Sequence, residues 1–302
     1  KFKMTMQKVC FITIFILAAS CNPLWAGAYP YAAETTSSAR KLMPVVGFVQ
    51  THSVEAGQTL IDIAWDYDLG FNEVRLAHPD TDPWVLETAT TVQIPTLWIL
   101  PPTRHQAVVV NIAEMRLYRF FKQHRMVKTY PLGIGRQGFE TPAVDCRVVE
   151  RQKSPSWTVP AFAQPHYEQA VVPPGPQNPL GEYWLGLSAE GLGFHGTNFA
   201  WGVGRRVSHG CLRLYPEDMV RFFEETPAGT PVEIIYEPVK IGCRGEQVFI
   251  EVHPDIYDRG LDLMAEAHGL IRRKGLSRSV DWDKVRHCVL RKNGIPTQVG
   301  QM

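Results

Sequence analysis

The sequence predicts a mainly β domain over residues 106–237 and, before it, a small βααβ domain over residues 48–97. The length of 302 residues exceeds the usual size of one domain. From residue 106, segments that alternate apolar and polar residues and are rich in β-branched and aromatic side chains indicate half-buried antiparallel strands. Between residues 54 and 95, two helical patterns lie between two strand-like segments, which indicates the βααβ order.

The composition is that of an ordinary globular protein, with 45% hydrophobic and 20% charged residues. A formal net charge of +1 gives no general attraction to a polyanion, which argues against a nucleic-acid-binding protein. The sequence has no Cys-x-x-Cys pair and no grouping of histidine and cysteine at metal-ligand spacing. We therefore expect neither a metal nor another cofactor.

Residues 1–28 have the pattern of a secretory signal peptide. Lys8 precedes an apolar run of eleven residues, which is too short to span a bilayer of about 30 Å as a helix, and the small residues up to Ala28 fit a cleavage site. We therefore expect export. A lipobox-like sequence that ends at Cys21 is the alternative, and it would attach a lipid to that cysteine and anchor the protein in a membrane. Residues 29–47 contain a Ser/Thr/Ala tract and are expected to form a mobile N-terminus.

In the βααβ domain, a helix is expected after Thr59, because Thr59 and Asp62 fit a capping box and apolar residues follow on one face. A second helical segment at 73–77 and a closing strand at 92–95 complete the domain. Prolines in and beside residues 98–105 predict an extended linker to the mainly β domain.

In the mainly β domain, strands are expected at 107–112, 116–120, 126–132 and 231–236. Residues 152–181 contain seven prolines, and a loop of this length inside a compact domain is uncommon and tends to have a function. We interpret this loop as a lid or a wall over a binding site, although a loop that only wraps the surface fits equally well.

The stretch from Phe194 to Arg213 holds one cysteine, two histidines and four glycines. A cysteine is a good nucleophile when an imidazole can take its proton, and a nearby glycine lets a substrate carbonyl approach backbone N–H groups. Cys211 follows His209 and a glycine, and His195 with its own glycine lies sixteen positions upstream. A single cysteine is more often a core residue or a disulfide partner. The combination predicts acyl transfer through a thioester.

The order His-Gly, spacer, Ser-His-Gly-Cys-Leu-Arg resembles the signature of the YkuD family of L,D-transpeptidases, with every part present and in order. The resemblance implies a catalytic domain of the YkuD type, mainly β and sandwich-like or barrel-like, with a helix after the cysteine motif. That helix is expected to begin at Tyr215-Pro216, because proline suits a first turn and Glu217 and Asp218 complement the positive helix end. Cys146 stands where the family usually has an aromatic residue, and we interpret it as a core-facing strand residue.

By this resemblance, Cys211 is the nucleophile, and His195 is the general base that activates it and later protonates the leaving amine. The backbone carbonyl of Gly196 would orient His195. Backbone N–H groups around Gly210 and Cys211 would form the oxyanion hole. Further residues expected to support the pocket or to meet acidic groups of the substrate are Ser208, His209, Arg213, Arg205 and Arg206. For the last two, a solvated charge pair is the alternative.

The βααβ domain resembles a lysin motif, a module that binds glycans containing N-acetylglucosamine, including peptidoglycan. The residues that carry this resemblance are Gly57, Thr59, Leu60, Ile63, Ala64, Ile94 and Pro95. Gln58 and His78 depart from the usual pattern, and a purely structural unit is the alternative. The combination of this motif with a signal peptide and a C-terminal extension is similar to the ErfK/YbiS/YcfS/YnhG group of the family.

The resemblance implies that Cys211 attacks the carbonyl at the L-centre of diaminopimelate in a peptidoglycan tetrapeptide stem, which releases D-alanine and leaves a thioester. An amine of another stem would then give a 3→3 cross-link, and a lysine of an outer-membrane lipoprotein would give an anchored protein. Water as the acceptor would make the protein an L,D-carboxypeptidase. A non-catalytic wall-binding scaffold also fits the sequence, whereas an NlpC/P60 or papain-like hydrolase is less favoured because the order of nucleophile and histidine is reversed. The expected place of action is the periplasm, at the cell wall.

Four cysteines lie outside the signal segment. In an oxidising compartment we favour a disulfide between Cys243 and Cys288, because Cys211 must remain a thiol if it is the nucleophile. Residues 238–302 form a C-terminal extension in which we find no motif. Its expected elements are a strand at 247–253 and helices at 261–271 and 281–290, and its histidines, all interpreted as ordinary surface or half-buried residues, are His253, His268 and His287.

Overall fold

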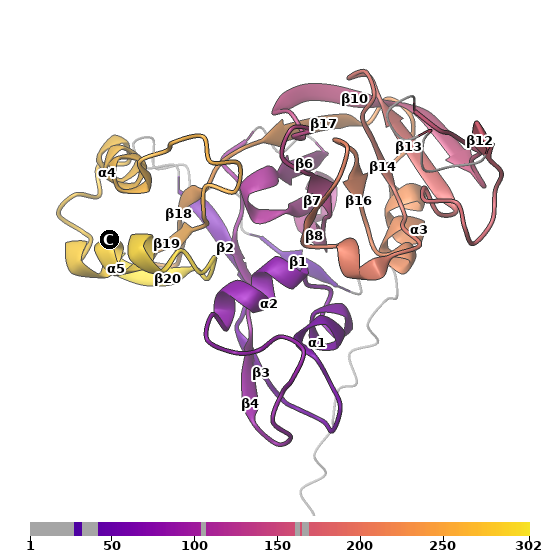
Figure 1. Ribbon diagram of the computed structural model, residues 1–302. Helices are drawn as coiled ribbons and strands as arrows, with labels where there is room; N and C mark the ends of the chain where they lie inside the picture. Colours follow the sequence, from indigo (N-terminus) through magenta and orange to yellow (C-terminus); the bar gives the residue numbers. More distant parts are fainter. Residues whose placement is uncertain (1–26, 32–41, 104–106, 161–163, 165–168) are drawn as a thin grey trace, which may run out of the picture.

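The computed structural model describes residues 27–31, 42–103, 107–160, 164 and 169–302 (Figure 1). The expected signal segment up to residue 26, and with it Cys21, lies outside the described residues. In the part that is described, no helix is both long and apolar enough to cross a membrane. The fold is mainly β, as the sequence predicts, and is built on one nine-stranded and one five-stranded sheet.

The nine-stranded sheet forms the core of the mainly β domain. The strands expected at 107–112, 116–120 and 126–132 are present as β6, β7 and β8 and form an antiparallel meander. The strand expected at 231–236 is β17, which pairs with β6 in parallel. In sheet order the strands are β1 (Ala28–Pro30), β8 (Met126–Pro131), β7 (Arg116–Phe121), β6 (Val108–Asn111), β17 (Pro231–Ile235), β10 (Val144–Lys153), β13 (Tyr183–Leu187), β14 (Gly193–His195) and β16 (Leu212–Arg213). A separate parallel pair, β9 (Ile134–Gly135) and β15 (Arg206–Ser208), lies beside this sheet.

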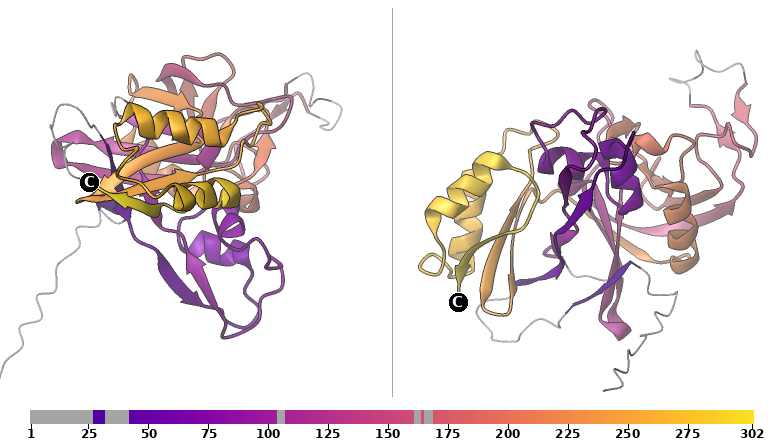
Figure 2. Two further views of the ribbon diagram at one scale, coloured as in Figure 1. Left: turned by 90° about the vertical axis from the view of Figure 1, so that its left-hand side faces the viewer. Right: turned by 90° about the horizontal axis from the view of Figure 1, so that it is seen from below.

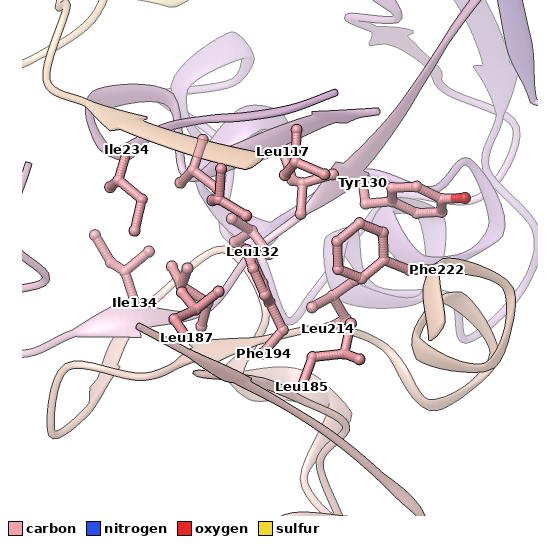
Figure 3. Close-up of a cluster of buried hydrophobic side chains, with 14 of the residues drawn as sticks. Leu117, Tyr130, Leu132, Ile134, Leu185, Leu187, Phe194, Leu214, Phe222 and Ile234 are labelled. Carbon is pink, nitrogen blue, oxygen red and sulfur yellow. The ribbon is translucent and has the colours of Figure 1, made fainter. Parts of the chain in front are cut away.

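Strands on both sides of β17 supply side chains to one hydrophobic cluster, among them Tyr130 of β8 and Phe194 of β14 (Figure 3). Helix α3 (Pro216–Glu225) follows the cysteine motif, and its Met219 and Phe222 complete the cluster. Proline in the first turn and two acidic residues there explain why the helix begins at this point. Phe194 lies fully buried in the same cluster, so the strand that carries His195 is fixed by the core.

The βααβ unit has the expected order of β3 (Gln50–Ser53), α1 (Leu60–Asp66), α2 (Phe71–Ala77) and β4 (Thr91–Ile94), and β3 pairs with β4 in antiparallel fashion. Thr59 and Asp62 form the predicted capping box of α1. The unit packs against the nine-stranded sheet through a buried ion pair of 2.6 Å between Glu73 of α2 and Arg116 of β7. Trp65 of α1 also stacks on Tyr215 ahead of α3. The βααβ unit is therefore packed against the mainly β domain through side-chain contacts.

The C-terminal extension does not form a separate unit, because its strands share a sheet with segments from near the N-terminus. The sheet order is β20 (Thr297–Gln301), β19 (Gln247–Val252), β18 (Val239–Arg244), β2 (Met43–Gly47) and β5 (Leu97–Ile99). Helices α4 (Leu263–Arg273) and α5 (Trp282–Arg291) lie on this sheet, on the side away from the nine-stranded sheet (Figures 1 and 2).

Two of the expected boundaries are corrected by strand pairing in the two sheets. Residues 29–47 were expected to be mobile, but they include part of β1 and all of β2, whose backbone groups pair with β8, β18 and β5. The expected linker, residues 98–105, begins inside β5. Residue composition indicated flexibility here, and hydrogen bonds to strands distant in the sequence override it.

The expected disulfide between Cys243 and Cys288 is absent, since both side chains are free thiols. Cys243 lies on β18, whereas Cys288 of α5 faces Thr297 at the start of β20. Strand β19 lies between β18 and β20, so the two cysteines belong to elements that are not neighbours in the sheet.

His253 is a second correction in the extension, because it is buried in a cluster of charged side chains and not at the surface. Its Nε2 lies 2.7 Å from Glu251, and the ammonium of Lys240 lies 3.0 Å from Glu251 and 2.7 Å from Glu114. Glu114, Glu251 and His253 are close enough together to suit a metal ion. Lys240 supplies the positive charge between the two carboxylates, so the cluster is an ion-pair network that joins the two sheets.

Candidate active site

Strands β14 and β16 are labelled in Figure 1, and their pairing brings the two principal predicted residues together. The strands pair in parallel with His195 opposite Arg213, and Cys211 stands two residues before Arg213. Because side chains two apart on an extended chain point the same way, His195, Arg213 and Cys211 share one face. All three line one cavity of about 510 Å³.

The proline-rich loop supplies part of the wall of this cavity. Residues 152–181 contain a short hairpin of β11 (Trp157–Thr158) and β12 (Val171–Val172), and Trp157, Thr158 and Pro160 line the cavity. Pro179 and Leu180 line it next to His195. The described part of the loop therefore borders the cavity, as a wall would.

His195 is held as a neutral imidazole with one defined tautomer. The side chain is 3% exposed, and Nδ1 donates a hydrogen bond of 2.6 Å to the carbonyl of Gly196. A carbonyl can only accept, so Nδ1 carries the proton and Nε2 is the basic atom. Burial, followed by the positive charge of Arg213, lowers the pKa of His195 to about 3, although its hydrogen bonds to backbone carbonyls act in the opposite direction.

Cys211 is correspondingly held as a thiol. Burial raises its pKa, and the N–H of Gly193 and the guanidinium of Arg213 reduce that increase because both stabilise a thiolate. The thiol lies 3.4 Å from the carbonyl of Gly191. A neutral thiol therefore faces the same cavity as a neutral imidazole, and the thiolate forms only when a base removes the proton.

The motif loop between β15 and β16 is fixed by hydrogen bonds to its own backbone. Ser208 Oγ donates to the carbonyl of Cys211 at 2.6 Å and accepts from the N–H of Gly210 at 3.2 Å. Gly210 has a φ of +111°, a region that favours glycine. Since the N–H of Gly210 is bonded to Ser208, it is not available for an oxyanion in this conformation. Among the described residues, no protein acceptor takes the N–H of Cys211, which makes it the better candidate for an oxyanion donor.

His209 is held by contacts with residues other than Cys211 and His195. It is exposed, its ring packs edge-on against Phe139 at 4.6 Å, and Arg136 donates to its Nε2 at 3.0 Å. Burial and the nearby arginines lower the pKa of His209. It still lines the cavity, so it forms part of the rim.

The three arginines that were predicted to support the pocket or to meet the substrate lie at two separate sites. Arg213 lies in the cavity with Cys211 and His195, where its charge affects both groups. Arg205 and Arg206 lie elsewhere: they line a second cavity that shares no lining residue with the first. The structure therefore does not bring these two arginines to the cysteine.

Sequence analysis missed two residues that hold the motif loop from outside. Thr141 Oγ1 donates to the carbonyl of Gly210 at 2.7 Å and accepts from the N–H of Gly135 at 3.0 Å. The hydroxyl of Tyr257, which follows β19, donates to the carbonyl of Gly135 at 2.8 Å and accepts from the N–H of Thr141 at 3.2 Å. Nothing local in the sequence connects Thr141 or Tyr257 to residue 210.

Trp184 is a third residue that was missed. It lies opposite His195 on β13, with ring centroids 6.0 Å apart, and it is held by a hydrogen bond of 2.9 Å from its Nε1 to Glu150. Its ring covers Gly193, where a Cβ atom would approach it to 2.3 Å. Glycine at 193 therefore lets an indole form the wall beside the histidine.

Comparison of the sequence with known proteins identifies its family. Residues 105–234 match the L,D-transpeptidase catalytic domain, YkuD. The chain is 38% identical over 256 residues to the probable L,D-transpeptidase YbiS of Escherichia coli K12, which covers 82% of this chain and 81% of that protein. It is 30% identical over 308 residues to the probable L,D-transpeptidase ErfK/SrfK of the same organism, with 97% of each chain covered.

The catalytic domain of an L,D-transpeptidase from E. faecium, solved by NMR, matches at 20% identity with a TM-score of 0.34 and covers 45% of this chain and all of that one. The alignments with the two Escherichia coli proteins extend over most of the chain and include the catalytic domain with its Ser-His-Gly-Cys sequence. The chain therefore belongs to the YkuD family of L,D-transpeptidases.

Proposed function

We propose that this L,D-transpeptidase uses Cys211 as its nucleophile and His195 as its base, on the tetrapeptide stems of peptidoglycan. The observation that carries the assignment is the shared cavity: the imidazole lies on β14, the thiol directly precedes the paired strand β16, and both line the same space. The defined tautomer of His195 leaves Nε2 as the proton acceptor. Arg213 beside both groups stabilises the negative charge that develops on sulfur.

In the first half-reaction, Nε2 of His195 takes the proton from Sγ of Cys211 while the sulfur attacks the carbonyl carbon at the L-centre of diaminopimelate. Negative charge moves to the carbonyl oxygen, where the N–H of Cys211 donates to it. The bond to the terminal D-alanine then breaks, and His195 gives its proton to the leaving amine. A thioester and free D-alanine remain.

In the second half-reaction, a primary amine attacks the thioester, His195 accepts the amine proton, and the sulfur leaves and recovers that proton. An amine of another stem gives a 3→3 cross-link, and a lysine of a lipoprotein gives an attached protein. The proposed acceptor is an amine, and water, the acceptor of a carboxypeptidase, is the competing outcome.

The βααβ unit is proposed to act as a lysin motif that binds the wall glycan, and the protein is proposed to be exported and to work at the cell wall in the periplasm. The order of the strands and helices and the capping box of α1 support the first part of this proposal. The signal-like pattern of residues 1–28 supports the second part.

The test is intact-mass analysis after incubation with a carbapenem, a β-lactam that acylates enzymes of this family. We expect one adduct on the wild-type protein and none on Cys211→Ala. Cys146→Ala is the matched control, because Cys146 is a half-buried thiol on β10 whose pKa is raised to about 11 by burial and by Asp145. An adduct that persists in Cys211→Ala, or no adduct on the wild type, would contradict the proposal.

The acceptor is identified by a second measurement. Peptidoglycan sacculi are incubated with the protein and digested with a muramidase, and the products are separated and weighed. A 3→3 linked dimer or a lipoprotein-linked fragment indicates an amine acceptor. A shortened stem with no new linkage indicates water.

A further inference from the structure

A second cavity, of about 440 Å³, lies where the βααβ unit, β15 and the segment after β19 meet. It shares no lining residue with the cavity of Cys211. The residues that matter for its chemistry are Phe71, Asn72, Arg75, Arg205, Arg206 and Ile256. They come from three parts of the chain that are distant in the sequence, so only the tertiary structure forms this cavity.

Arg205 is unusual in this cavity. Its Nε and Nη2 are buried, and neither has a hydrogen-bond partner among the described residues. Its guanidinium lies 3.8 Å above the ring of Phe71 and 6.0 Å from the rings of both Trp84 and Trp201. Buried charged donors without an acceptor are costly and rare, and a site for a missing acceptor is a physical reason for them.

The other charged side chains that line the cavity are also positive. No aspartate or glutamate is among the described residues that line the cavity. Arg75 donates to the backbone carbonyls of His78 and Pro79, and Arg206 donates to that of Ile256, so these contacts leave both positive charges unneutralised. The cavity therefore favours an anion, and the planar fork of Arg205 fits a carboxylate.

Two further features indicate which kind of ligand the cavity would bind. The Oδ1 atom of Asn72 is buried and has no donor among the described residues, so it can accept from an N–H or O–H close to the carboxylate. The rings of Trp84 and Trp201 each lie 6.0 Å from the guanidinium of Arg205, and the two side chains are 58% and 54% exposed. Exposed aromatic faces of this kind mark interaction sites, and their negative π-surface suits the C–H face of a sugar ring.

We propose that this cavity binds a carboxylate of a peptidoglycan glycopeptide, with Arg205 as the carboxylate ligand and a sugar ring against Trp84 or Trp201. The inference rests on the proposed function for the class of ligand, but it concerns a site separate from Cys211. The site holds the wall at the junction of the βααβ unit and the catalytic domain, and so acts as an anchoring site during acyl transfer.

The test is isothermal titration of the full chain with N-acetylmuramyl-L-alanyl-D-glutamate, a probe that lacks the diaminopimelate carbonyl that Cys211 would attack. We expect the wild-type protein and Cys211→Ala to bind the probe equally, and Arg205→Gln to bind it about tenfold more weakly or worse, because one charge-assisted bidentate contact is lost. Arg205→Lys keeps the charge without the fork and should bind with intermediate strength. Arg286→Gln, at an exposed ion pair on α5, is the control and should bind like the wild type.

Thermal unfolding of each variant confirms that it is folded. Amidation of the carboxyl groups of the probe should weaken binding as much as Arg205→Gln does. Equal binding by Arg205→Gln and the wild type, no binding by the wild type, or equally effective competition by inorganic phosphate would overturn the inference. The carbapenem experiment on Cys211 is independent of these results, so failure of either proposal is seen separately.

Discussion

At the scale of single residues, the cavity combines a thiol and an imidazole that are both uncharged at rest. Burial disfavours the ionised form of each: it raises the pKa of Cys211 and lowers that of His195. A preformed thiolate–imidazolium pair is therefore not the resting state. In the proposed mechanism, proton transfer accompanies attack on the substrate, and Arg213 and the N–H of Gly193 stabilise the sulfur as it becomes negative.

The first prediction is the pH dependence of thiol reactivity in the free protein. Alkylation requires thiolate, and the pKa of Cys211 is raised, so the rate with iodoacetamide should increase up to pH values above the ordinary thiol pKa of about 8.5. The pKa of about 3 for His195 means that no inflection should occur near pH 6.5. The measurement is the alkylation rate from pH 5 to 10, read by mass on Cys211. A plateau below pH 7 would indicate an ion pair and contradict the assignment.

At the scale of elements, the site depends on which strands pair. The parallel pairing of β14 and β16 sets His195 and Cys211 on one face, and the core residues Phe194 and Leu212 between them hold the register. The motif loop is then held from the other side by Thr141, which in turn is held by Tyr257 beyond β19. The C-terminal extension thus contributes to the position of the cysteine without contacting it.

The second prediction follows for Tyr257→Phe, which removes two hydrogen bonds from Gly135 and Thr141. We expect a loss of stability of about 1–3 kcal/mol and slower acylation of Cys211 by a carbapenem at saturation, because Thr141 no longer fixes the carbonyl of Gly210. The carbapenem binding constant and the pH profile should not change, since neither the cavity wall nor the titrating groups are altered.

The control for this positioning role is Tyr67→Phe, which loses a hydroxyl contact to His52 in the βααβ unit, far along the chain from the motif loop. Acylation rates are measured by stopped-flow at a temperature well below both unfolding transitions. If Tyr67→Phe slows acylation as much as Tyr257→Phe does, the effect is general destabilisation and the positioning role is wrong.

At the scale of the whole molecule, the two sheets and the βααβ unit form one connected structure. Glu73 and Arg116 join the βααβ unit to the nine-stranded sheet, and the Lys240 cluster joins that sheet to the five-stranded one. Both sets of charges are buried and paired. Breaking such a pair on one side leaves an uncompensated charge, which costs more than the pair itself contributes.

The third prediction concerns Lys240→Met, which leaves the carboxylates of Glu114 and Glu251 without their cation. We expect the free energy of unfolding to fall by about 3–5 kcal/mol. Urea unfolding followed by circular dichroism measures this loss. Arg286→Met at an exposed ion pair on α5 should change stability by at most about 1 kcal/mol. Similar small losses in both variants would show that the cluster does not hold the sheets together.

The local features of the chain were largely predictable. The capping box of Thr59 and Asp62, the helix that begins at Pro216 and the meander of β6 to β8 follow from residue spacing and propensity alone. The flanking segments were not predictable in this way. Residues 43–47 and 97–99 carry no strong strand signal. Residues 43–47 are a strand because they pair with β18, from much later in the chain, and residues 97–99 pair in turn with residues 45–47.

The sequence by itself determined which residues are proposed for the chemistry, because the order and spacing of His195, Ser208, Gly210 and Cys211 are local properties of one stretch. The tertiary structure alone decided which groups surround that chemistry. It placed Arg205 in a separate cavity and Tyr257 behind the motif loop. The physical reason is that burial, hydrogen-bond partners and charge neighbours come from strands that pair across long sequence separations, and a linear pattern does not specify those contacts.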